Sequence, residues 1–578
     1  MIYRIADNVV SPLGMTTAEN FQALKAGRSA LCRYKHHWGL PETFTASLFS
    51  EAQNRELHIP SLTRFESLAV RSVQDALQQT TLDVAASNVI FILSTTKANI
   101  ELLGEGADPG PAAAAERIAR YLGFTTQPLV VCNACISGVS AIVLAERLLD
   151  AGMYDYAVVC GADVQNPFTV SGFQSLKAVA EDDCRPFDLE RLGLNLGEAA
   201  ATIVFQRQEK TGCWAVERGA VRNDGYHISA PSKNGEGARL ALEAIGAEDI
   251  KDQLAFINAH GTATMFNDQM ESVAIARAGL QEVPVNALKG YFGHTLGAAG
   301  VLETVLSIAA ADDHTILGTR GFEELGVSGK IRLSSQHTTT NKQSFIKMIS
   351  GFGGGNGAIV VSKAHVSTVE NRSYHVGNAT FPRWEQHALL LQPSSLKIDN
   401  EPVAVTEQGM ALLTALYKQR IGDYPKYYKM DALSRLGFVA SELLLQAAGD
   451  GEEHLSQHTA VILFNRSSSI VADRQYQASI GDADFATPHA LRENFFPSPS
   501  VFVYTLPNIV TGEIALRHGW HSETSFYILG ERNDELMHRV VSASLAECGA
   551  DRVLTGWIDY EDDQHFVADL HLIVNNNN

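Results

Sequence analysis

Short apolar segments alternate with longer helical ones through the first 363 residues, and this alternation restricts the fold more than any other feature of the chain. Helical spacing of apolar residues is clear in SGVSAIVLAERLLDAG (137–152). The segments that read as buried strands are VIFIL (89–93), YAVVCGA (156–162), ATIVF (201–205) and AIVVS (358–362). Strands that alternate with helices in this way indicate an α/β architecture.

A second α/β region runs from about residue 386 to 574, and it repeats part of the first. The matching pairs keep their order and rough spacing: LTRFESLAV (62–70) with LSRLGFVAS (433–441), IARYLGF (118–124) with IALRHGW (514–520), and DAGMYDYAVVCGAD (150–163) with AECGADRVLTGWID (546–559). Residues 364–385 lose the apolar periodicity and are predicted to be a linker. The repeat covers only the half of the first unit that contains Cys135.

Size and composition restrict the partners and the compartment. The 578 residues suffice for two or three domains, with 45% hydrophobic and 19% charged residues. A net charge of −20 argues against nucleic acid or an anionic membrane as the main partner. We expect no membrane span, because a span needs about eighteen consecutive apolar residues. No signal peptide is apparent at the N-terminus, and seven scattered cysteines suit a reducing cytoplasm.

The first chemistry-bearing segment is NACISGVSAIVLAERLL (133–149), where a strand meets a helix at Cys135. Helix N–H groups and the positive end of the helix dipole favour a thiolate there, which is the nucleophilic form. A free cysteine usually serves as a small buried hydrophobe, and this segment alone does not distinguish that role from a nucleophile. Cys132 and Cys135 also form a C-x-x-C, but a metal site would need a second pair, and the other motifs do not fit a redox pair.

Two histidines lie in equally specific surroundings. In INAHGTATMFNDQMES (257–272), His260 ends an apolar strand and is followed by glycine, with the hydroxyls of Thr262 and Thr264 close behind. In NALKGYFGHTLGAAGVLETV (286–305), His294 lies between Gly293 and a small-residue helix start, five residues after Lys289. Strand ends are where α/β proteins build their sites. A lone histidine is more often structural, and a lone lysine is more often a solvated charge.

The fourth segment, ISGFGGGNGAIVV (349–361), is rich in glycine. It has no GK[ST] and a strand follows it, which makes a nucleotide-phosphate loop a poor interpretation. It reads better as a flexible loop that presents backbone N–H groups and one aromatic ring, Phe352.

Taken together and in this order, the four segments resemble the β-ketoacyl-acyl carrier protein synthases of the elongating type, within the thiolase-like superfamily. CRPFDLERLGLNLGEAAA (184–201) and NDGYHISAPSKNGEG (223–237) extend the match. The resemblance implies a five-layer αβαβα fold made of two related halves, residues 1–207 and 208–363. Cys135 would lie on one half and both histidines on the other.

The resemblance also implies roles in a decarboxylative condensation. Cys135 would carry the acyl group as a thioester. His260 and His294 would polarise the malonyl thioester and stabilise the enolate left by decarboxylation. The backbone N–H groups of Cys135 and Phe352 would form the oxyanion hole, and Phe352 would gate acyl entry.

Further residues are assigned by the same resemblance. Lys289 would tune the charge near His294, with Glu303 behind it as a supporting partner. Thr262 and Thr264 would hold the phosphopantetheine arm of an acyl carrier protein, and Phe173 would lie near the acyl channel. No metal and no bound cofactor is implied. Members of the family usually dimerise, so a homodimer, or a heterodimer with another synthase-like subunit, is expected.

Related enzymes differ at diagnostic positions. Degradative thiolases use a second cysteine late in the unit, and no cysteine lies between the His260 segment and residue 363. Chalcone-like synthases have asparagine in place of His294, and chain-length-factor subunits lack the nucleophile. Two departures from the elongating pattern remain. Ile136 replaces the usual small residue after the nucleophile, and the usual GFGGTN loop reads GFGGGN.

The second region resembles the N-terminal half of the same family. Carrying the spacing from Gly123 to Cys135 onto Gly519 places Glu531 at the nucleophile position, while Cys548 maps to a later helix end. We therefore predict that residues 386–574 form a catalytically inactive half-unit. It would shape the acyl tunnel, pack on the condensing domain or help to recognise a partner.

Three functions are compatible with these observations. The first is an active condensing enzyme of fatty acid or polyketide/polyene synthesis that releases 3-oxoacyl carrier protein. The second is a decarboxylase or chain-length subunit that needs another synthase. The third is a non-catalytic scaffold that binds acyl carriers. Intact Cys-His-His chemistry favours the first.

Overall fold

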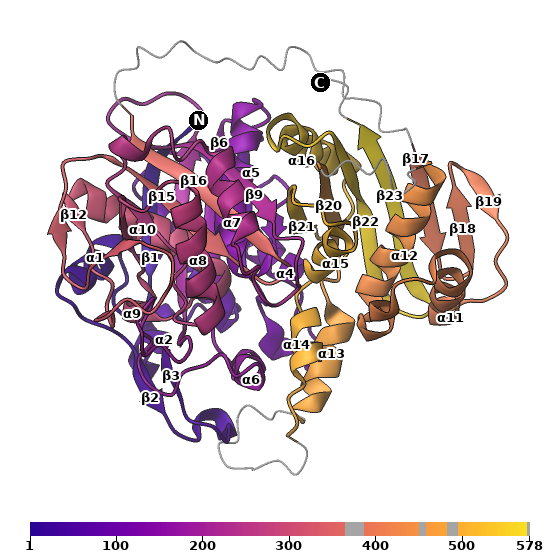
Figure 1. Cartoon of the computed structure of the whole chain (residues 1–578), viewed down its shortest axis with the longest axis horizontal. Helices are drawn as coiled ribbons and strands as arrows, with labels where there is room; N and C mark the ends of the chain where they lie inside the picture. The colour runs from indigo at the N-terminus through magenta and orange to yellow at the C-terminus, as the bar shows by residue number, and fades with distance from the viewer. Residues whose placement is uncertain (365–386, 450–457, 482–494, 575–578) are drawn as a thin grey trace.

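The computed structural model describes residues 1–364, 387–449, 458–481 and 495–574. The predicted linker, 364–385, and the first residue of the second region, 386, lie outside the described residues except for Ala364. Residues 1–364 are called the N-terminal unit below, and residues 387–574 the C-terminal region. Figure 1 shows the two parts side by side, with the C-terminal region in orange and yellow.

The N-terminal unit is built around two large sheets, which are joined where β1 also pairs with β9. The first has the order β5-β4-β6-β8-β1, with bounds Leu129–Val131, Val89–Ser94, Tyr156–Asp163, Ala199–Gln206 and Ile2–Val10. The second has the order β9-β16-β15-β10-β11-β13, with bounds Trp214–Asn223, Gly355–Lys363, Ser344–Ser350, Phe256–Asn258, Pro284–Asn286 and Arg332–Leu333. The strands at one end of each sheet pair in parallel, and they are continuous apolar runs because both faces of the sheet are covered. The strands expected from the sequence are confirmed as β4, β6, β8 and β16.

Two helices lie between the sheets. These are α5 (Ser137–Asp150) and α10 (Ala299–Asp312), and they pack on each other and on strands of both sheets. Nearly every residue of both is buried, as expected for helices that are apolar all round. Gly138 permits their close approach, because a Cβ there would lie 2.8 Å from the backbone nitrogen of Val301.

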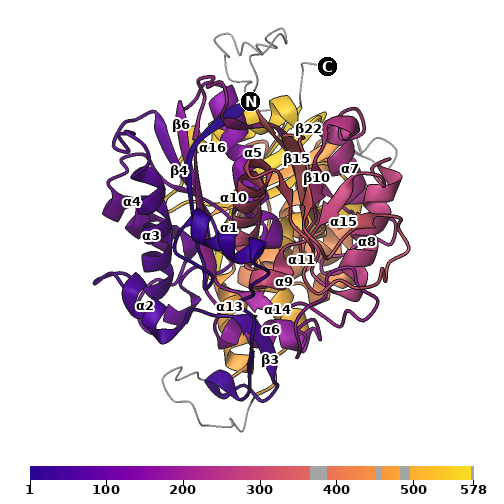
Figure 2. The same ribbon diagram turned by 90° about the vertical axis from the view of Figure 1, so that its left-hand side faces the viewer.

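Amphipathic helices cover the outer faces and complete the five layers (Figure 2). On the first sheet these are α3 (Arg64–Leu77) and α4 (Pro111–Leu122); on the second they are α7 (Glu236–Ala244) and α8 (Met265–Arg277), which packs on α7. Helix α3 begins with a capping box in which Thr63 and Glu66 satisfy each other's backbone N–H groups. None of the helices in the described ranges is long and apolar enough to cross a membrane.

The C-terminal region repeats the first sheet of the N-terminal unit. Its strand order is β21-β20-β22-β23-β17, with bounds Thr524–Ile528, Thr459–Asn465, Arg552–Asp562, His565–Val574 and His387–Gln392. The pairings are parallel, parallel, antiparallel and antiparallel, as in β5-β4-β6-β8-β1. Strands β18 (Ser395–Ile398) and β19 (Glu401–Val403) extend the edge. The fold predicted from the internal repeat, a half-thiolase-like α/β unit, is confirmed.

Helices of the C-terminal region also match their counterparts. Helices α12 (Ala432–Ala447) and α15 (Ile509–His518) cover the sheet as α3 and α4 do, and α16 (Asp534–Glu547) packs against α5. Two further helices, α13 (Ile470–Ser479) and α14 (Pro499–Tyr504), lie toward the N-terminal unit. Helix α14 contacts α6 (Pro167–Ser175) of that unit.

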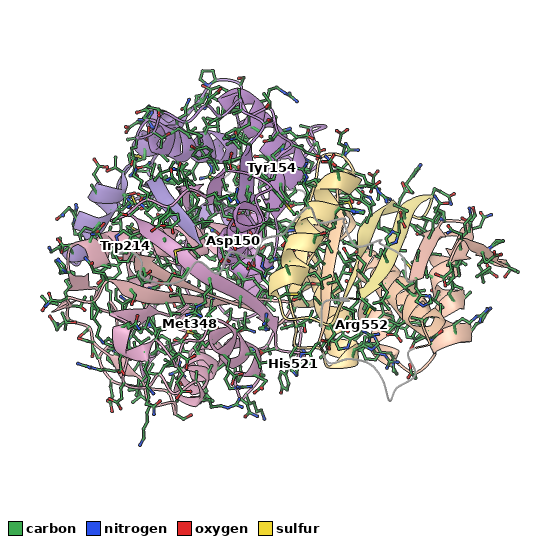
Figure 3. The ribbon with its side chains drawn as sticks, turned by 90° about the horizontal axis from the view of Figure 1, so that it is seen from above. Asp150, Tyr154, Trp214, Met348, His521 and Arg552 are labelled. Atoms are coloured by element: carbon green, nitrogen blue, oxygen red, sulfur yellow. The ribbon has the colours of Figure 1, made fainter. Side chains whose placement is uncertain are left out.

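The two parts share one sheet. Strand β21 pairs antiparallel with β5, with Tyr527 opposite Val131 and Ile528 opposite Val130. The edge of β5 is therefore covered from within the chain, around an approximate two-fold axis. A buried ion pair, Arg147 with Glu523 at 2.7 Å, also crosses the junction. In Figure 3, His521 lies at the junction, where its Nδ1 contacts the backbone oxygen of Asn223 at 3.0 Å.

Candidate active site

Cys135 lies where β5 passes into the central helix α5. A single 3₁₀ turn, Ala134–Ile136, joins the two elements, and Ala134 takes a left-handed conformation with φ of 50°. The Ser137 hydroxyl closes this turn: it accepts a hydrogen bond from the Asn133 N–H at 2.9 Å and donates one to the Ala134 carbonyl at 2.5 Å. The expected placement of the cysteine at a helix start is thus what the structure has. Its side chain is almost fully buried.

His260 follows β10 and is held by its backbone. The carboxylate of Glu271, on α8, accepts hydrogen bonds from the N–H groups of His260 and Gly261 at 2.7 and 2.8 Å. The carbonyl of His260 accepts a hydrogen bond from Lys289 Nζ at 2.7 Å. The imidazole itself is buried, and its Nδ1 has no hydrogen-bond partner among the described residues. The ring is therefore fixed in place but keeps a free polar atom.

His294 follows the short helix α9 (Lys289–Phe292) and Gly293. Its N–H donates to the Asn195 carbonyl at 2.7 Å. Its Nδ1 accepts a hydrogen bond from the Leu296 N–H at 3.2 Å, which assigns the proton of the neutral ring to Nε2. Within the described part of the chain Nε2 is buried without a partner, so it is a hydrogen-bond donor available to a ligand.

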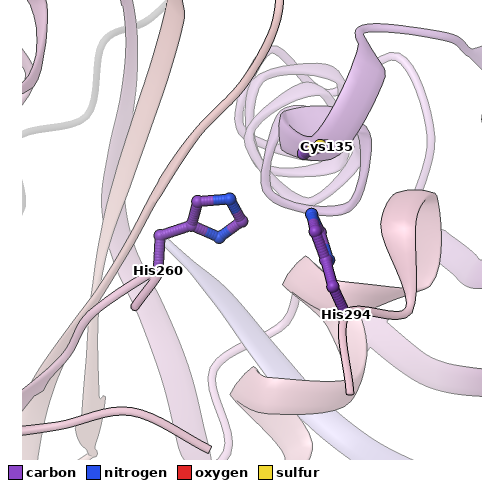
Figure 4. Close-up of side chains that lie close together, drawn as sticks. All are labelled: Cys135, His260 and His294. Carbon is purple, nitrogen blue, oxygen red and sulfur yellow. The ribbon is translucent and has the colours of Figure 1, made fainter. Parts of the chain in front are cut away.

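The three side chains converge, as the motifs predict. The Cys135 sulfur and a nitrogen of each imidazole all lie within 4.8 Å of one another. The two rings are 4.9 Å apart between centroids and nearly perpendicular, at 81°. Figure 4 shows both rings beside the helix start that carries Cys135. The Cys135 sulfur thus faces two imidazoles whose nitrogens have unused hydrogen-bonding capacity among the described residues.

A buried ionic triad lies behind the histidines. Lys289 Nζ is 2.7 Å from Glu303 Oε1, and the other oxygen of Glu303 contacts Lys347 Nζ. Lys347 also donates to the Ala259 carbonyl at 3.2 Å. The sequence motifs identify Lys289 and Glu303 but miss Lys347. Its signal was a lysine inside the apolar strand SFIKMIS, a position where an unpaired charge is too costly to be retained.

Burial and the triad control protonation in the site. Burial raises the pKa of the Cys135 thiol to about 12, although Lys289 opposes the shift. Burial also lowers the pKa of His260 and of His294 well below 6.5, and the positive charges of Lys289 and Lys347 lower both further. Near neutral pH the site therefore holds a thiol and two uncharged imidazoles. The thiolate stabilisation expected at the helix start is opposed by burial, so the sulfur needs a proton acceptor when it reacts.

The two threonines lie in a turn organised by Asp268. The Oγ1 atoms of Thr262 and Thr264 are 2.9 Å apart. The Asp268 carboxylate accepts hydrogen bonds from the N–H groups of Thr262 and Ala263 at 3.0 and 3.1 Å. Thr262 is buried and Thr264 is half-buried, which leaves one hydroxyl on the outer side of the turn. Asp268 and Glu271 both belong to FNDQMES, the end of the segment that contains His260, and neither was singled out from the sequence.

The glycine-rich loop lies against the nucleophile. A Cβ on Gly351 would be 3.2 Å from the backbone nitrogen of Cys135. The Phe352 ring stacks on Phe173 with a centroid distance of 6.1 Å, and Phe173 meets Phe502 of the C-terminal region edge-on at 5.4 Å. The two predicted aromatics are thus in contact. The sequence alone did not indicate that a third ring comes from the C-terminal region.

Among the described residues, Cys135, His260 and His294 are also the one group of Cys, His, Asp or Glu side chains spaced to hold a metal ion. Thiolate and imidazole are ligands that zinc accepts. A metal there would take the lone pairs on sulfur and nitrogen that acyl transfer requires. The same three atoms can therefore either bind a metal ion or carry out acyl transfer, but not both at once.

Comparison with known proteins agrees with this geometry. The model of the β-ketoacyl synthase N-terminal domain matches residues 5–211, and that of the β-ketoacyl synthase C-terminal domain matches residues 215–323. A 3-oxoacyl-[acyl-carrier-protein] synthase 2 from Vibrio cholerae is 26% identical over 410 residues, which cover 61% of this chain and 97% of that protein. The ketoacyl synthase alpha subunit of tetracenomycin polyketide synthase from Streptomyces glaucescens is 31% identical over 273 residues, 44% of this chain and 64% of that protein.

Solved structures extend the likeness of the fold. The ishigamide ketosynthase/chain length factor has a TM-score of 0.56 at 24% identity and covers 63% of this chain and 98% of that chain. The PfaC keto synthase–chain length factor has a TM-score of 0.73 at 14% identity and covers 99% of this chain and 78% of that chain. The second likeness includes the C-terminal region. The chain belongs to the β-ketoacyl synthase family of the thiolase-like superfamily, acyltransferases that condense acyl thioesters with malonyl-acyl carrier protein.

Proposed function

We propose that this protein is an active condensing enzyme in which Cys135, His260 and His294 convert an acyl thioester and malonyl-acyl carrier protein into 3-oxoacyl-acyl carrier protein. The observation that carries the proposal is the convergence of the sulfur and two imidazole nitrogens within 4.8 Å. The first step is acyl transfer to the Cys135 sulfur. The thiol proton passes to a neutral imidazole, for which the free Nδ1 of His260 is suited, and then to the departing carrier thiolate.

The second step is decarboxylation of the malonyl group. Each neutral imidazole carries one N–H, and both are placed to donate to the thioester oxygen as negative charge develops on it. Carbon dioxide leaves, and the electron pair of the broken bond forms the enolate. Donors held in a buried site stabilise such charge strongly, because no solvent has to reorganise. His294 has a fixed role in this step, since its Nδ1 is already occupied and its Nε2 must donate.

The third step is attack of the enolate carbon on the acyl thioester of Cys135. The carbonyl oxygen would become negative beside the N–H groups of Cys135 and Phe352, and the close approach of Gly351 to Cys135 supports this pairing. Collapse of the tetrahedral intermediate breaks the carbon–sulfur bond, and the cysteine thiolate takes a proton from solvent. Thr262 and Thr264 hold the phosphopantetheine arm that the carrier protein delivers. No other cofactor has a role in these steps.

The ionic triad would keep the imidazoles uncharged. Lys289 and Lys347 place positive charge next to both rings, which disfavours imidazolium. Glu303 balances the two lysines and ties them to one position. Lys289 in addition fixes the His260 backbone. A protonated pair of histidines could not accept the thiol proton, so the triad supports the first step.

The C-terminal region would serve as an inactive half-synthase that completes the condensing unit. Counting equally from the paired residues Val131 and Tyr527 leads to Cys135 in one half and to Glu531 in the other. Glu531 is exposed, and Cys548 lies at the C-terminal end of α16, and both positions support the proposal that this half is inactive. The position of Phe502 supports a role of the C-terminal region in shaping the acyl channel. A Cβ on Gly172 would lie 2.1 Å from its ring, so this ring closes directly on α6.

The whole chain is similar in fold to a ketosynthase–chain length factor. This likeness favours a C-terminal region that completes the condensing unit over a separate partner subunit. The homodimer expected from the family remains a prediction. Within this chain the edge of β5 already pairs with β21, so that edge is not open to a second copy. Acyl carrier protein is the partner that the reaction requires. The seven cysteines are free, which supports a cytoplasmic location.

The test is product formation by the purified protein without any second synthase. Acyl carrier and carbon-13 malonyl carrier are mixed with the protein, and the 3-oxoacyl carrier is measured by mass. Wild type should give product, while Cys135→Ala should release labelled carbon dioxide without product. His294→Ala should do neither. Decarboxylation without product by the wild type would instead identify a subunit that depends on a partner, and absence of both reactions would identify a scaffold.

A further inference from the structure

The glycine-rich loop that carries Phe352 is held from both sides. From the N-terminal unit, the Ile228 carbonyl accepts a hydrogen bond from the Gly353 N–H at 2.6 Å, and the Asn223 side chain donates to the Gly353 carbonyl at 2.8 Å. From the C-terminal region, the side-chain amide of Asn508 donates to the Phe352 carbonyl at 2.8 Å. The peptide that joins Phe352 to Gly353 is thus fixed by groups from both parts of the chain.

Packing at this point leaves no room for other side chains. Gly353 has φ of 88°, and a Cβ on it would lie 2.5 Å from Nδ2 of Asn508. A Cβ on Gly512, in helix α15, would lie 2.6 Å from the Gly353 carbonyl oxygen. Two glycines on opposite sides of the junction therefore let the loop backbone touch the start of α15, which places Asn508 within reach of the loop.

Asn508 has few alternatives for its donor. The residue is 5% exposed, and its Oδ1 has no partner in the described part of the chain. Its own carbonyl accepts the Thr511 hydroxyl at 2.8 Å, which fixes the first turn of α15. A buried amide that makes one good hydrogen bond gives a strongly directional restraint, because releasing the Phe352 carbonyl would leave the amide unsatisfied.

We propose that Asn508 is a positioning residue that sets the Phe352 loop from the C-terminal region, so that opening of the active site to an acyl chain depends on that region. The proposal rests on the proposed function, in which Phe352 gates acyl entry and supplies an oxyanion-hole N–H. The same residue carries both features. The Phe352 carbonyl is held by Asn508, the preceding residue Gly351 lies against Cys135, and the Phe352 ring stacks on Phe173.

The consequence is a division between reaction steps. A loop that is held in place supports condensation, because the oxyanion-hole N–H stays aimed at the thioester. Entry of the acyl group would require the loop to leave Asn508. Loss of Asn508 should therefore slow condensation and speed access to Cys135. A general loss of structure would not separate the two effects in this way.

The first measurement needs no substrate. Amide hydrogen exchange of residues 351–355 is compared in wild type, Asn508→Ala and the isosteric variant Asn508→Asp. Exchange in the loop should rise by about tenfold in both variants, while exchange in α15 and α16 stays at the wild-type rate. The matched control is Gln127→Ala. It removes the interdomain contacts of Gln127 with Glu531 and Asn533, which lie elsewhere on the junction, and should leave the loop unchanged.

The second measurement compares two reactions at the same cysteine. In Asn508→Ala, kcat for 3-oxoacyl formation should fall about three- to tenfold with KM for the acyl carrier unchanged. Alkylation of Cys135 by iodoacetamide should become faster. Gln127→Ala should change neither value. Opposite signs for condensation and alkylation distinguish a released loop from a damaged site.

Several results would overturn the proposal. Unchanged loop exchange in both Asn508 variants would show that the hydrogen bond does not hold the loop. Increased exchange with unchanged kcat and alkylation would show that the position of the loop does not matter to the reaction. If wild type fails to acylate at all, the proposed function fails, while the exchange measurement still decides whether Asn508 holds the loop.

Discussion

The protonation state of the site around Cys135 depends on neighbouring residues that do not themselves react. Its sulfur is buried, its two imidazole partners are kept neutral by burial and by two lysines, and Glu303 balances those lysines. The site is thus organised for neutral hydrogen-bond donors rather than for a resting thiolate–imidazolium pair. Both residue-scale predictions follow from this protonation state.

The first concerns the thiol. With a pKa raised to about 12, Cys135 should be alkylated by iodoacetamide about tenfold faster for each pH unit between pH 7 and 9, because the thiolate fraction rises in proportion. The adduct is followed on the Cys135 peptide by mass, since Cys32 is exposed and reacts separately. A rate that levels off by pH 8 would show that the thiolate is much more stable than burial allows.

The second concerns Lys347. Its charge helps to lower the pKa of His260 and His294, so Lys347→Met should raise both. The histidines would then become protonated at higher pH as pH falls. The acid limb of malonyl-carrier decarboxylation should move upward by about one pH unit. Lys363→Met removes an exposed partner of Asp312 and is the control that should not move it. If the acid limb of decarboxylation does not move in Lys347→Met, the charge of Lys347 does not control the protonation of the two histidines.

The sequence predicted that Cys135, His260 and His294 lie together, as the structure has them, but it missed the residues that support them. Cys135, His260 and His294 stand next to glycines and small residues, and such surroundings are unusual enough to be recognised. Lys347 and Glu271 lie inside a strand and a helix, where local pattern marks them only as polar residues in apolar surroundings. Their partners come from distant segments, and no local rule selects those partners.

The elements were predicted well where they are buried. Strands β4, β6 and β8 are continuous apolar runs because helices cover both faces of the sheet, and such runs are clear in a sequence. The pairing of β21 with β5 was not predicted. Both strands are apolar, and which edges meet depends on the whole surface of each half rather than on either strand.

An element-scale prediction concerns α14 and α6. Phe502 meets Phe173 edge-on and lies against Gly172, so Phe502→Ala should open space at the end of the proposed channel. Products should shift to longer acyl chains, measured by mass on the carrier. Loss of the buried ring should also lower the free energy of unfolding by about 3 kcal/mol.

Its control is Phe496→Ala, which truncates an exposed ring of the same region and should leave the product distribution unchanged. The converse variant, Gly172→Ala, places a methyl group into the Phe502 ring and should shift products to shorter chains. Unchanged chain length in both Phe502→Ala and Gly172→Ala would show that α14 does not bound the acyl chain.

At the scale of the whole molecule, one chain builds an arrangement with approximate two-fold symmetry. The shared sheet through β5 and β21 and the packing of α5 on α16 bring half of a synthase against a complete one. Sequence comparison between the halves shows the repeat but not this contact. In the proposed function this contact would give a region without a nucleophile its role, since it places Phe502 against Phe173 and Asn508 against Phe352.

The junction also carries a buried charge pair. Arg147 and Glu523 are both about 1% exposed, so Arg147→Met would leave Glu523 buried without its cation. Unfolding measured in denaturant should show a loss of about 3–5 kcal/mol. The double variant Arg147→Met with Glu523→Leu should regain much of it, since an apolar pair needs no compensation. Equal stability of the single and double variants would mean that the pair is not coupled across the junction.

The intact mass of the protein after incubation with acyl carriers shows directly whether Cys135 takes up an acyl group. Acyl carriers of several chain lengths are offered to wild type and to Cys135→Ala, and malonyl carrier is then added. We expect an acyl adduct on the wild type only, which disappears as 3-oxoacyl carrier forms. An adduct on Cys135→Ala, or no adduct on the wild type with any carrier, would contradict this expectation.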